Sequence, residues 1–469
     1  SWTNRCKYEL WYYSRAKETN QFWNKLHFLI GARKVKKQMK KMLQTVVYVL
    51  TFSVLFQACS SDSDSSTDSS NNGGNNDMMA PTTYEFYDAD ENSTVVYSGQ
   101  VVRNLIITDI KGLVSSDPSL LVGMYENTEA NQARTITSGT GSFPAVQSTY
   151  GDISGSNLNG KIAATGDGYG IDDCTVAGYG MEPDALVRAW MDAASSGAYS
   201  SDGIDIGQML QKSLMGLVSY YQGTSKYLGV VLDLDNTGPD GDNYYTKREH
   251  YWDESFGYFG ASADYLNRTD AEIKSAVYND SNGDGSIDFL SENCTGLSIN
   301  AAKRDDGSSN MYDFTGTIMS AYLEGRHLIS TGGSDADVAA QRTIIVNAWE
   351  KLLAANAIHY INDTVGDIGD GSSWAGTETA ACTADTELCQ DYTKHWSEMR
   401  GFAVGLHYNR YKLISDTDLA SVYTLMGAAP VWIGTAGAEA TLQFKADLLA
   451  ARDILQAAYG FDADVVANW

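Results

Sequence analysis

The sequence predicts a mainly α-helical protein, a large helical-bundle domain with long loops rich in Gly and Asp. Apolar residues recur with the helical period over several long windows. Only 6 of the 469 residues are proline, a residue that interrupts helices. Alternating runs of β-branched residues, which strands favour, are few in the C-terminal half. Together these observations favour packed helices over a sheet.

Several helices can be placed individually. Ser98 is expected to be the N-cap of a helix over 98–113, and Pro183 is expected at the first position of another, where its missing N–H costs nothing. The clearest helix is expected over 337–362, because its apolar residues make a continuous stripe. Further windows with helical period cover 206–221, 392–413 and 438–459.

The first 58 residues differ from the rest of the chain. They hold 11 of the 33 Lys and Arg residues but only 2 of the 59 acidic residues. Residues 39–58 combine a short basic start with an apolar stretch too short to span a bilayer, and Cys59 follows directly. This pattern predicts a lipoprotein signal peptide and a lipid on Cys59. The alternative, an uncleaved membrane anchor, is disfavoured by the polar tract after Cys59.

The remaining boundaries follow from composition. Residues 1–38 are expected to be an upstream extension that is not native, ahead of a natural start at Met39. Residues 59–82 are expected to form a disordered tether, because 60–77 contain no apolar residue. The folded helical domain is expected over 83–469, as one domain or as two lobes, 83–295 and 296–469.

Beyond its leader the chain is strongly acidic, and the whole sequence has a net charge of −26. Such a surface repels phosphate groups, so nucleic acid is excluded as a partner. It attracts cations, although charge alone defines neither a fold nor an activity.

Four cysteines follow Cys59, in an exported and therefore oxidising setting. They permit three pairings. The short separation of Cys382 and Cys389 predicts a local disulfide, which leaves Cys174 with Cys294 by elimination. No C-x-x-C zinc pattern occurs.

The segment from Asp280 to Glu292 predicts a structural calcium site. Carboxylate and amide side chains alternate in it, Gly285 supplies a sharp turn, and a backbone carbonyl follows, as in a calcium-binding loop. The acidic residue of the twelfth position comes one residue late. The expected ligands are Asp280, Asn282, Asp284, Ser286, Asp288 and Glu292.

Histidines with nearby carboxylates suggest a second metal site. In a helix, His250, Asp253 and Glu254 would share one face, and His395 with Glu398 has similar spacing. Two such helices facing each other could enclose iron, zinc or manganese. The alternative is that the aromatic residues around His250 form a core stripe and that the histidines are ordinary core residues.

Three pieces of the sequence carry a resemblance: V-Y-S-G-Q from Val96, H-Y-W-D-E-S-F-G-Y-F-G from His250 and H-W-S-E-M-R-G-F-A from His395. They resemble an uncharacterised family of Gram-negative lipoproteins, a domain of unknown function. That family is distantly similar to imelysin-like proteins, helical envelope proteins implicated in iron uptake, whose metal pattern is G-x-H-x-x-E. Here the corresponding stretch contains His327 but ends in Ser330, which removes the carboxylate.

The resemblance implies a protein anchored by lipid in the cell envelope, at the outer membrane, with outer-membrane uptake components as partners. Three classes of function remain. A binding component of iron or other metal uptake fits the anchor and the histidine–carboxylate pairs. A glycan- or nutrient-capturing lipoprotein fits the anchor and the many Tyr and Trp residues. A metalloenzyme is least favoured, because neither H-E-x-x-H nor G-x-S-x-G occurs.

Overall fold

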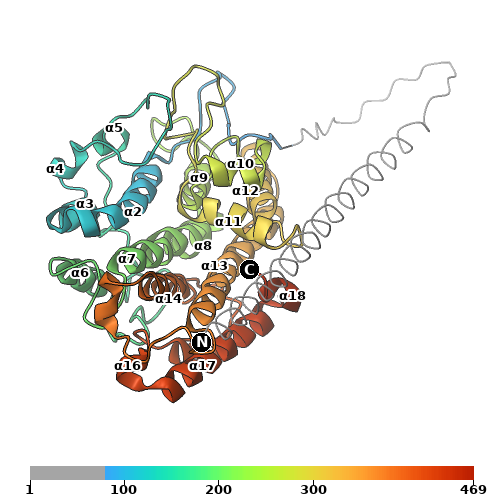
Figure 1. Cartoon of the computed structure of the whole chain (residues 1–469). Helices are drawn as coiled ribbons and strands as arrows, with labels where there is room; N and C mark the ends of the chain where they lie inside the picture. Colours follow the sequence, from blue (N-terminus) through green and yellow to red (C-terminus); the bar gives the residue numbers. More distant parts are fainter. Residues whose placement is uncertain (1–79) are drawn as a thin grey trace, which may run out of the picture. The chain divides into compact units, whose positions relative to one another are not determined.

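The computed structural model describes residues 80–469, which are mainly helical (Figure 1). Within these residues, β pairing is limited to isolated bridges. The fold class predicted from the sequence is therefore confirmed. The longer helices are α2 (Ser98–Ser116), α6 (Pro183–Ala194), α7 (Ile206–Leu214), α9 (Lys247–Phe259), α11 (Gly296–Gly307), α12 (Phe314–Thr331), α13 (Asp335–Ile368), α14 (Glu387–Gly405), α15 (Asp416–Met426) and α17 (Ala438–Tyr459).

Short helices complete the described chain. The α-helical ones are α3 (Leu121–Tyr125), α4 (Glu129–Gln132), α5 (Tyr150–Ile153), α8 (Leu228–Val230), α10 (Asp270–Ser275), α16 (Ile433–Ala436) and α18 (Ala463–Val466). Short 3₁₀ segments are η1 (Pro118–Leu120), η3 (Val231–Asp233), η4 (Tyr265–Asn267) and η5 (Ala380–Ala384). The leader, Cys59 and most of the expected tether lie outside the described residues, so the predictions made for them stay predictions.

The observed helix ends match the predicted ones where a local sequence signal, such as a proline, marks them. Helix α17 has the predicted bounds, and Pro183 is the first residue of α6. Helix α2 begins at Ser98 itself, so the predicted N-cap is one residue off. Helix α14 begins five residues before its predicted start and ends at Gly405, eight residues before its predicted end, where Tyr408 N–H donates to the Gly405 carbonyl in a turn. Farther along, the N–H groups of Leu413 and Ile414 donate to the carboxylate of Glu350.

Helix α13 is the longest and lies at the centre, packed against α12, α14 and α17. Helix α7 packs against α2 and α14, and α9 packs against α2 and α12. Helices from both halves of the chain thus pack together, and residues 78–469 form one compact unit. No helix between residues 80 and 469 combines the length and apolar character that crossing a bilayer requires.

A long π-helical stretch is the unusual element. Helix α7 continues without a break into 13 residues of π-helix, η2 (Met215–Tyr227), and then into α8. Stretches of π-helix are rare and are often found at functional sites. Gly216 and Gly405 let η2 and α14 meet backbone to backbone, since a Cβ on Gly216 would lie 2.4 Å from the Cα of Gly405.

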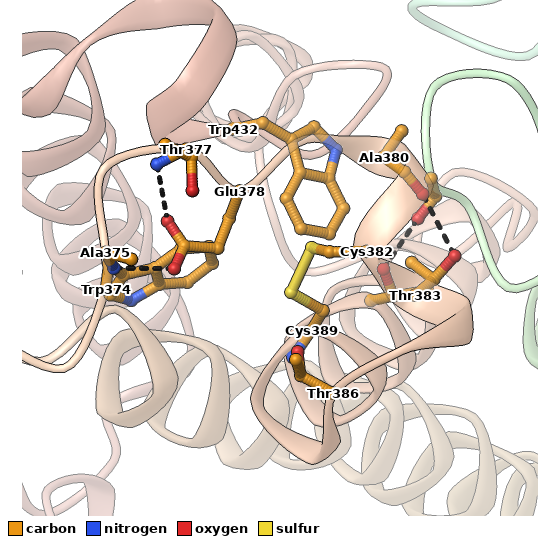
Figure 2. The surroundings of a disulfide bond; sticks show 12 residues. Trp374, Ala375, Thr377, Glu378, Ala380, Cys382, Thr383, Thr386, Cys389 and Trp432 are labelled. Carbon is orange, nitrogen blue, oxygen red and sulfur yellow. Dashed lines mark hydrogen bonds between the residues drawn. A yellow bond between two sulfur atoms is a disulfide. The ribbon is translucent and has the colours of Figure 1, made fainter.

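The cysteines behave in two ways. Cys382 and Cys389 form the predicted disulfide, which joins η5 to the first turn of α14 beside Trp432 (Figure 2). The pairing of Cys174 with Cys294 is wrong, because both are free and buried in different surroundings. The carbonyl of Cys174 accepts a hydrogen bond from Tyr408, whereas the Cys294 thiol contacts Ser262. Burial raises the pKa of both thiols, so they stay protonated at neutral pH.

Candidate functional site

Helix α9 begins and ends with clear local signals. Thr246 and Glu249 form a capping box at its start, and Gly260 ends it in the left-handed conformation. Trp252, Asp253 and Phe256 are fully buried. The helix therefore turns Asp253, a fully buried charged side chain, into the core together with its aromatic residues.

Arg326 of α12 neutralises that charge. Its side chain is 0% exposed. Its Nε lies 2.9 Å from Asp253 Oδ1 and its Nη1 lies 2.6 Å from Glu249 Oε1. We call this group, with Thr94, Tyr84 and Ser330, the Arg326 cluster.

The other members of the Arg326 cluster supply further hydrogen bonds, while Asp253 Oδ2 stays buried without a partner among residues 80–469. Nη2 of Arg326 donates to Thr94 Oγ1 at 2.8 Å, and the Tyr84 hydroxyl donates to Asp253 Oδ1 at 2.8 Å. Burial raises the pKa of Asp253 to about 6, although Arg326 acts in the opposite direction. All three guanidinium nitrogens donate, so the cluster ties α9, α12 and the chain before α2 together.

The predicted trio of His250, Asp253 and Glu254 is divided by this arrangement. Asp253 belongs to the Arg326 cluster, so the prediction that it shares a cation with His250 is wrong. His250 instead stacks on Tyr245, with ring centroids 4.5 Å apart, and its Nε2 lies 3.8 Å from Glu254 Oε2. Glu254 also accepts a hydrogen bond from Gln100.

The stretch around His327 is likewise structural. The hydroxyl of Ser330 donates to Glu249 Oε1 at 2.8 Å, inside the Arg326 cluster. The half-buried His327 side chain makes no hydrogen bond to any other residue of 80–469; its backbone carbonyl accepts one from Thr331. His327 therefore stands apart from the other predicted ligands.

A polar cavity of about 430 Å³ lies between α2, α7, α11, α13 and α14. We call it the Lys212 cavity. It contains both residues of the second predicted pair, His395 and Glu398, but not His250. Its lining consists of Thr108, Lys111, Gln208, Gln211, Lys212, Met215, Gly296, Ile299, Asn300, Lys303, His359, Tyr360, Asp363, Lys394, His395 and Glu398.

Two histidines and two aspartates line up along α13 and α14. His395 Nδ1 lies 2.8 Å from Asp367 Oδ2, and its Nε2 lies 4.0 Å from Asp363 Oδ2. The same Asp363 oxygen is 3.4 Å from His359 Nε2. Burial lowers the pKa of His359 to about 4, with the nearby Arg304 charge acting in the same direction. Burial also acts to lower the pKa of His395, but the hydrogen bond with Asp367 outweighs it and raises that pKa.

Lys212 is the most enclosed cation of the cavity, with 8% of the residue exposed. Its ammonium group donates to Gln211 Oε1 at 2.6 Å and lies 3.4 Å from Glu398 Oε1. Burial lowers its pKa to about 8. The neighbouring charges of Lys111 and Lys303 act in the same direction, whereas Glu398 opposes them.

Several buried atoms of the Lys212 cavity have no hydrogen-bond partner within residues 80–469. They are Gln208 Oε1, Glu398 Oε2 and His359 Nδ1. Buried polar atoms are normally paired, so three such atoms around one cavity indicate a place for water or a ligand.

In the predicted calcium loop, the acidic side chains accept hydrogen bonds from backbone N–H groups of the loop itself. Asp280 accepts hydrogen bonds from the N–H groups of Asp284 and Gly285. Glu292 turns back into the loop and accepts from the N–H groups of Ser281 and Asp288. Across residues 80–469, no three His, Cys, Asp or Glu side chains are grouped so that they could hold a metal ion. The calcium prediction therefore stays a prediction.

Sequence reasoning missed part of the cavity. His359 and Asp363 are spaced i, i+4 on a predicted helix, a signal that was available. The four lysines come from four helices, and no local pattern connects them. Only the packing of α2, α7, α11 and α14 brings Lys111, Lys212, Lys303 and Lys394 to one cavity.

Residues 190–378 match the model of a protein family described as a domain of unknown function (DUF4856). This match supports the resemblance to an uncharacterised family. The matched part contains α7, α9, α11, α12 and the whole of α13. It therefore includes the central ion pairs of the Arg326 cluster and the lining of the Lys212 cavity except for the residues on α2 and α14. Neither a curated protein nor a solved structure matches the chain.

Proposed function

We propose that this chain is an envelope-anchored lipoprotein that binds a ligand for iron or other metal uptake in the Lys212 cavity. The observation that carries the proposal is the set of unpartnered polar atoms around that cavity, next to the imidazole–carboxylate row of His359, Asp363, His395 and Asp367. Imidazole and carboxylate groups suit iron, zinc and manganese. A cavity of about 430 Å³ also falls in the range of small-molecule sites.

The anchor is the second part of the proposal and rests on the sequence around Cys59. Lipid on this residue would hold the domain at the outer membrane through the tether over 59–82. Cys59→Ala should move the protein from the membrane fraction to the soluble fraction. A variant that stays with the membranes would contradict the anchor without affecting the cavity.

Metal content tests the binding role. The purified protein, incubated with iron(III), zinc or manganese, each alone and as its citrate complex, should retain metal in elemental analysis after desalting. His395→Ala should lose most of that metal, because it removes the imidazole held by Asp367. His327→Ala is the matched control, since His327 lies outside the cavity. Equal metal content in both variants would refute a metal-related role for the cavity.

A groove near the start of the described chain favours a second function, the capture of a glycan. It has a volume of about 500 Å³ and is lined by the chain around Tyr84 to Ser98, with Leu290 on the other side. Tyr87 is 60% exposed there, and aromatic faces stack on sugars. Oligosaccharide binding that is lost in Tyr87→Ala and kept in His395→Ala would favour this alternative.

We also propose that the loop from Asp280 to Glu292 binds a structural calcium ion. Excess calcium should then stabilise the protein by about 2.7 kcal/mol at one hundred times the dissociation constant. Asp284→Ala should abolish the increase in melting temperature, whereas Asp242→Ala, in another exposed loop, should keep it. An identical melting curve with calcium and with chelator would exclude the site.

A further inference from the structure

The lysines of the Lys212 cavity form a concentration of positive charge in a chain whose net charge is −26. Each of four helices supplies one, and only Asp363 and Glu398 among the lining residues are acidic. Gathering like charges is unfavourable unless something of opposite sign joins them.

The lysines have little opposite charge from the protein. Among residues 80–469, Glu398 is the only carboxylate within 4.0 Å of Lys212, and no ion pair is found there for Lys111, Lys303 or Lys394. An ammonium group has three donors, and that of Lys212 uses one for Gln211 while a second points toward Glu398. Donors thus remain for a ligand.

The unpartnered atoms define the rest of the ligand. Gln208 Oε1 and Glu398 Oε2 are acceptors, so they need donors such as hydroxyl groups. Nδ1 of His359 can donate or accept, according to the tautomer of the ring, so it can pair with either kind of group. An apolar ligand would leave all of these atoms unpaired, at a cost of about 1–3 kcal/mol each.

We propose that the Lys212 cavity binds a small oxyanion with at least two acidic groups and a hydroxyl donor, held by Lys111, Lys212, Lys303 and Lys394. The choice of cavity rests on the proposed function, but the anion can bind with or without a metal. Because no three His, Cys, Asp or Glu side chains of residues 80–469 are grouped to take a bare ion, a metal would enter here as a complex with such an anion.

Titration calorimetry with three probes tests the ligand class. Citrate carries three carboxylates and a hydroxyl, tricarballylate has the same carboxylates without the hydroxyl, and inorganic phosphate is the compact alternative. We expect citrate to bind, tricarballylate to bind several-fold more weakly, and the affinity to fall as salt is added. Stronger binding of phosphate than of citrate would point to a phosphate compound as the oxyanion.

Charge removal tests the site. Lys303→Gln with Lys394→Gln changes side chains that are exposed or half-buried, so the fold should persist, and citrate affinity should fall at least tenfold. Lys212→Met should do the same. Lys351→Gln is the control, because it removes one charge from α13 outside the cavity. Unchanged affinity in the double variant, or no binding of any probe up to 10 mM, roughly the limit of a specific site, would overturn the proposal.

The outcomes separate this inference from the proposed function. Citrate binding without any retention of metal would support the anion site and refute the metal-uptake role. Retention of bare metal without anion binding would support the metal-uptake role and refute the anion site.

Discussion

The Arg326 cluster and the Lys212 cavity are both built from charged side chains inside a helical protein, yet they differ in how those charges are paired. In the cluster, every nitrogen of the guanidinium donates to a carboxylate, a hydroxyl or a carbonyl. In the cavity, four lysines meet two carboxylates, and three buried polar atoms lack a partner. Asp253 Oδ2 in the cluster is also buried without a partner, so the contrast lies in the cations. A cation whose donors are all paired holds the fold together, whereas several cations that lack a carboxylate indicate a ligand.

Arg326→Met should have the largest effect on stability. It leaves Glu249 and Asp253 buried without their cation, which costs about 3–5 kcal/mol. Chemical denaturation followed by circular dichroism measures this loss. The loss should be smaller at pH 5 than at pH 8, because removing the cation raises the pKa of Asp253 further above its value in the unfolded chain.

The matched change in the cavity is Lys212→Met with Glu398→Gln. Replacing a buried pair as a whole is often neutral, so the free energy of unfolding should change by less than about 1 kcal/mol. A loss as large as that of Arg326→Met would show that the cavity is structural and would remove the contrast between the two regions.

Gly325→Ala tests the cluster through packing. A Cβ at this position would lie 2.0 Å from Cζ2 of the fully buried Trp252, so α9 and α12 must separate. We expect a loss of about 2–3 kcal/mol in denaturant unfolding. Gly366→Ala on α13 is the control, because nothing lies within 4 Å of its Cβ, and it should gain about 0.5–1 kcal/mol. Similar effects of both substitutions would refute the close approach.

Removal of the disulfide tests whether this bond holds in place α14, which supplies part of the cavity lining. Cys382→Ser with Cys389→Ser opens a short loop at the start of α14 and should cost about 2 kcal/mol. His395 and Glu398 lie on the same helix, so hydrogen exchange should increase at its first turns. Unchanged exchange there would mean that packing alone holds the helix.

The pH dependence of stability isolates the contribution of a single buried group, Lys212. The pKa of Lys212 in the folded protein is about 8, below the value of about 10.4 for an unfolded chain. The unfolded chain then holds more protons between these values, so the contribution of Lys212 makes stability rise with pH by at most about 1.4 kcal/mol per unit. The difference between the wild type and Lys212→Met, measured from pH 8 to 10, isolates this slope. No difference in slope would contradict the lowered pKa.

The sequence predicted local features well. Helix α17 and the start of α6 follow from periodicity and from Pro183, and the disulfide of Cys382 with Cys389 follows from their spacing. The predictions failed for residues whose interaction partners are distant in the chain. Asp253 looked like a metal ligand because its true partner, Arg326, is 73 residues away. The pairing of Cys174 with Cys294, predicted by elimination, is wrong for the same reason, because separation along the chain does not give distance in the fold.

The contact between Gly216 and Gly405 also limits how the molecule can move. Two backbones that touch cannot approach further, and any side chain between them would push the helices apart. The π-helical stretch and α14 therefore behave as one rigid wall of the Lys212 cavity. We expect a ligand to enter from the other side, where exposed Lys111 and Lys303 border the cavity on α2 and α11.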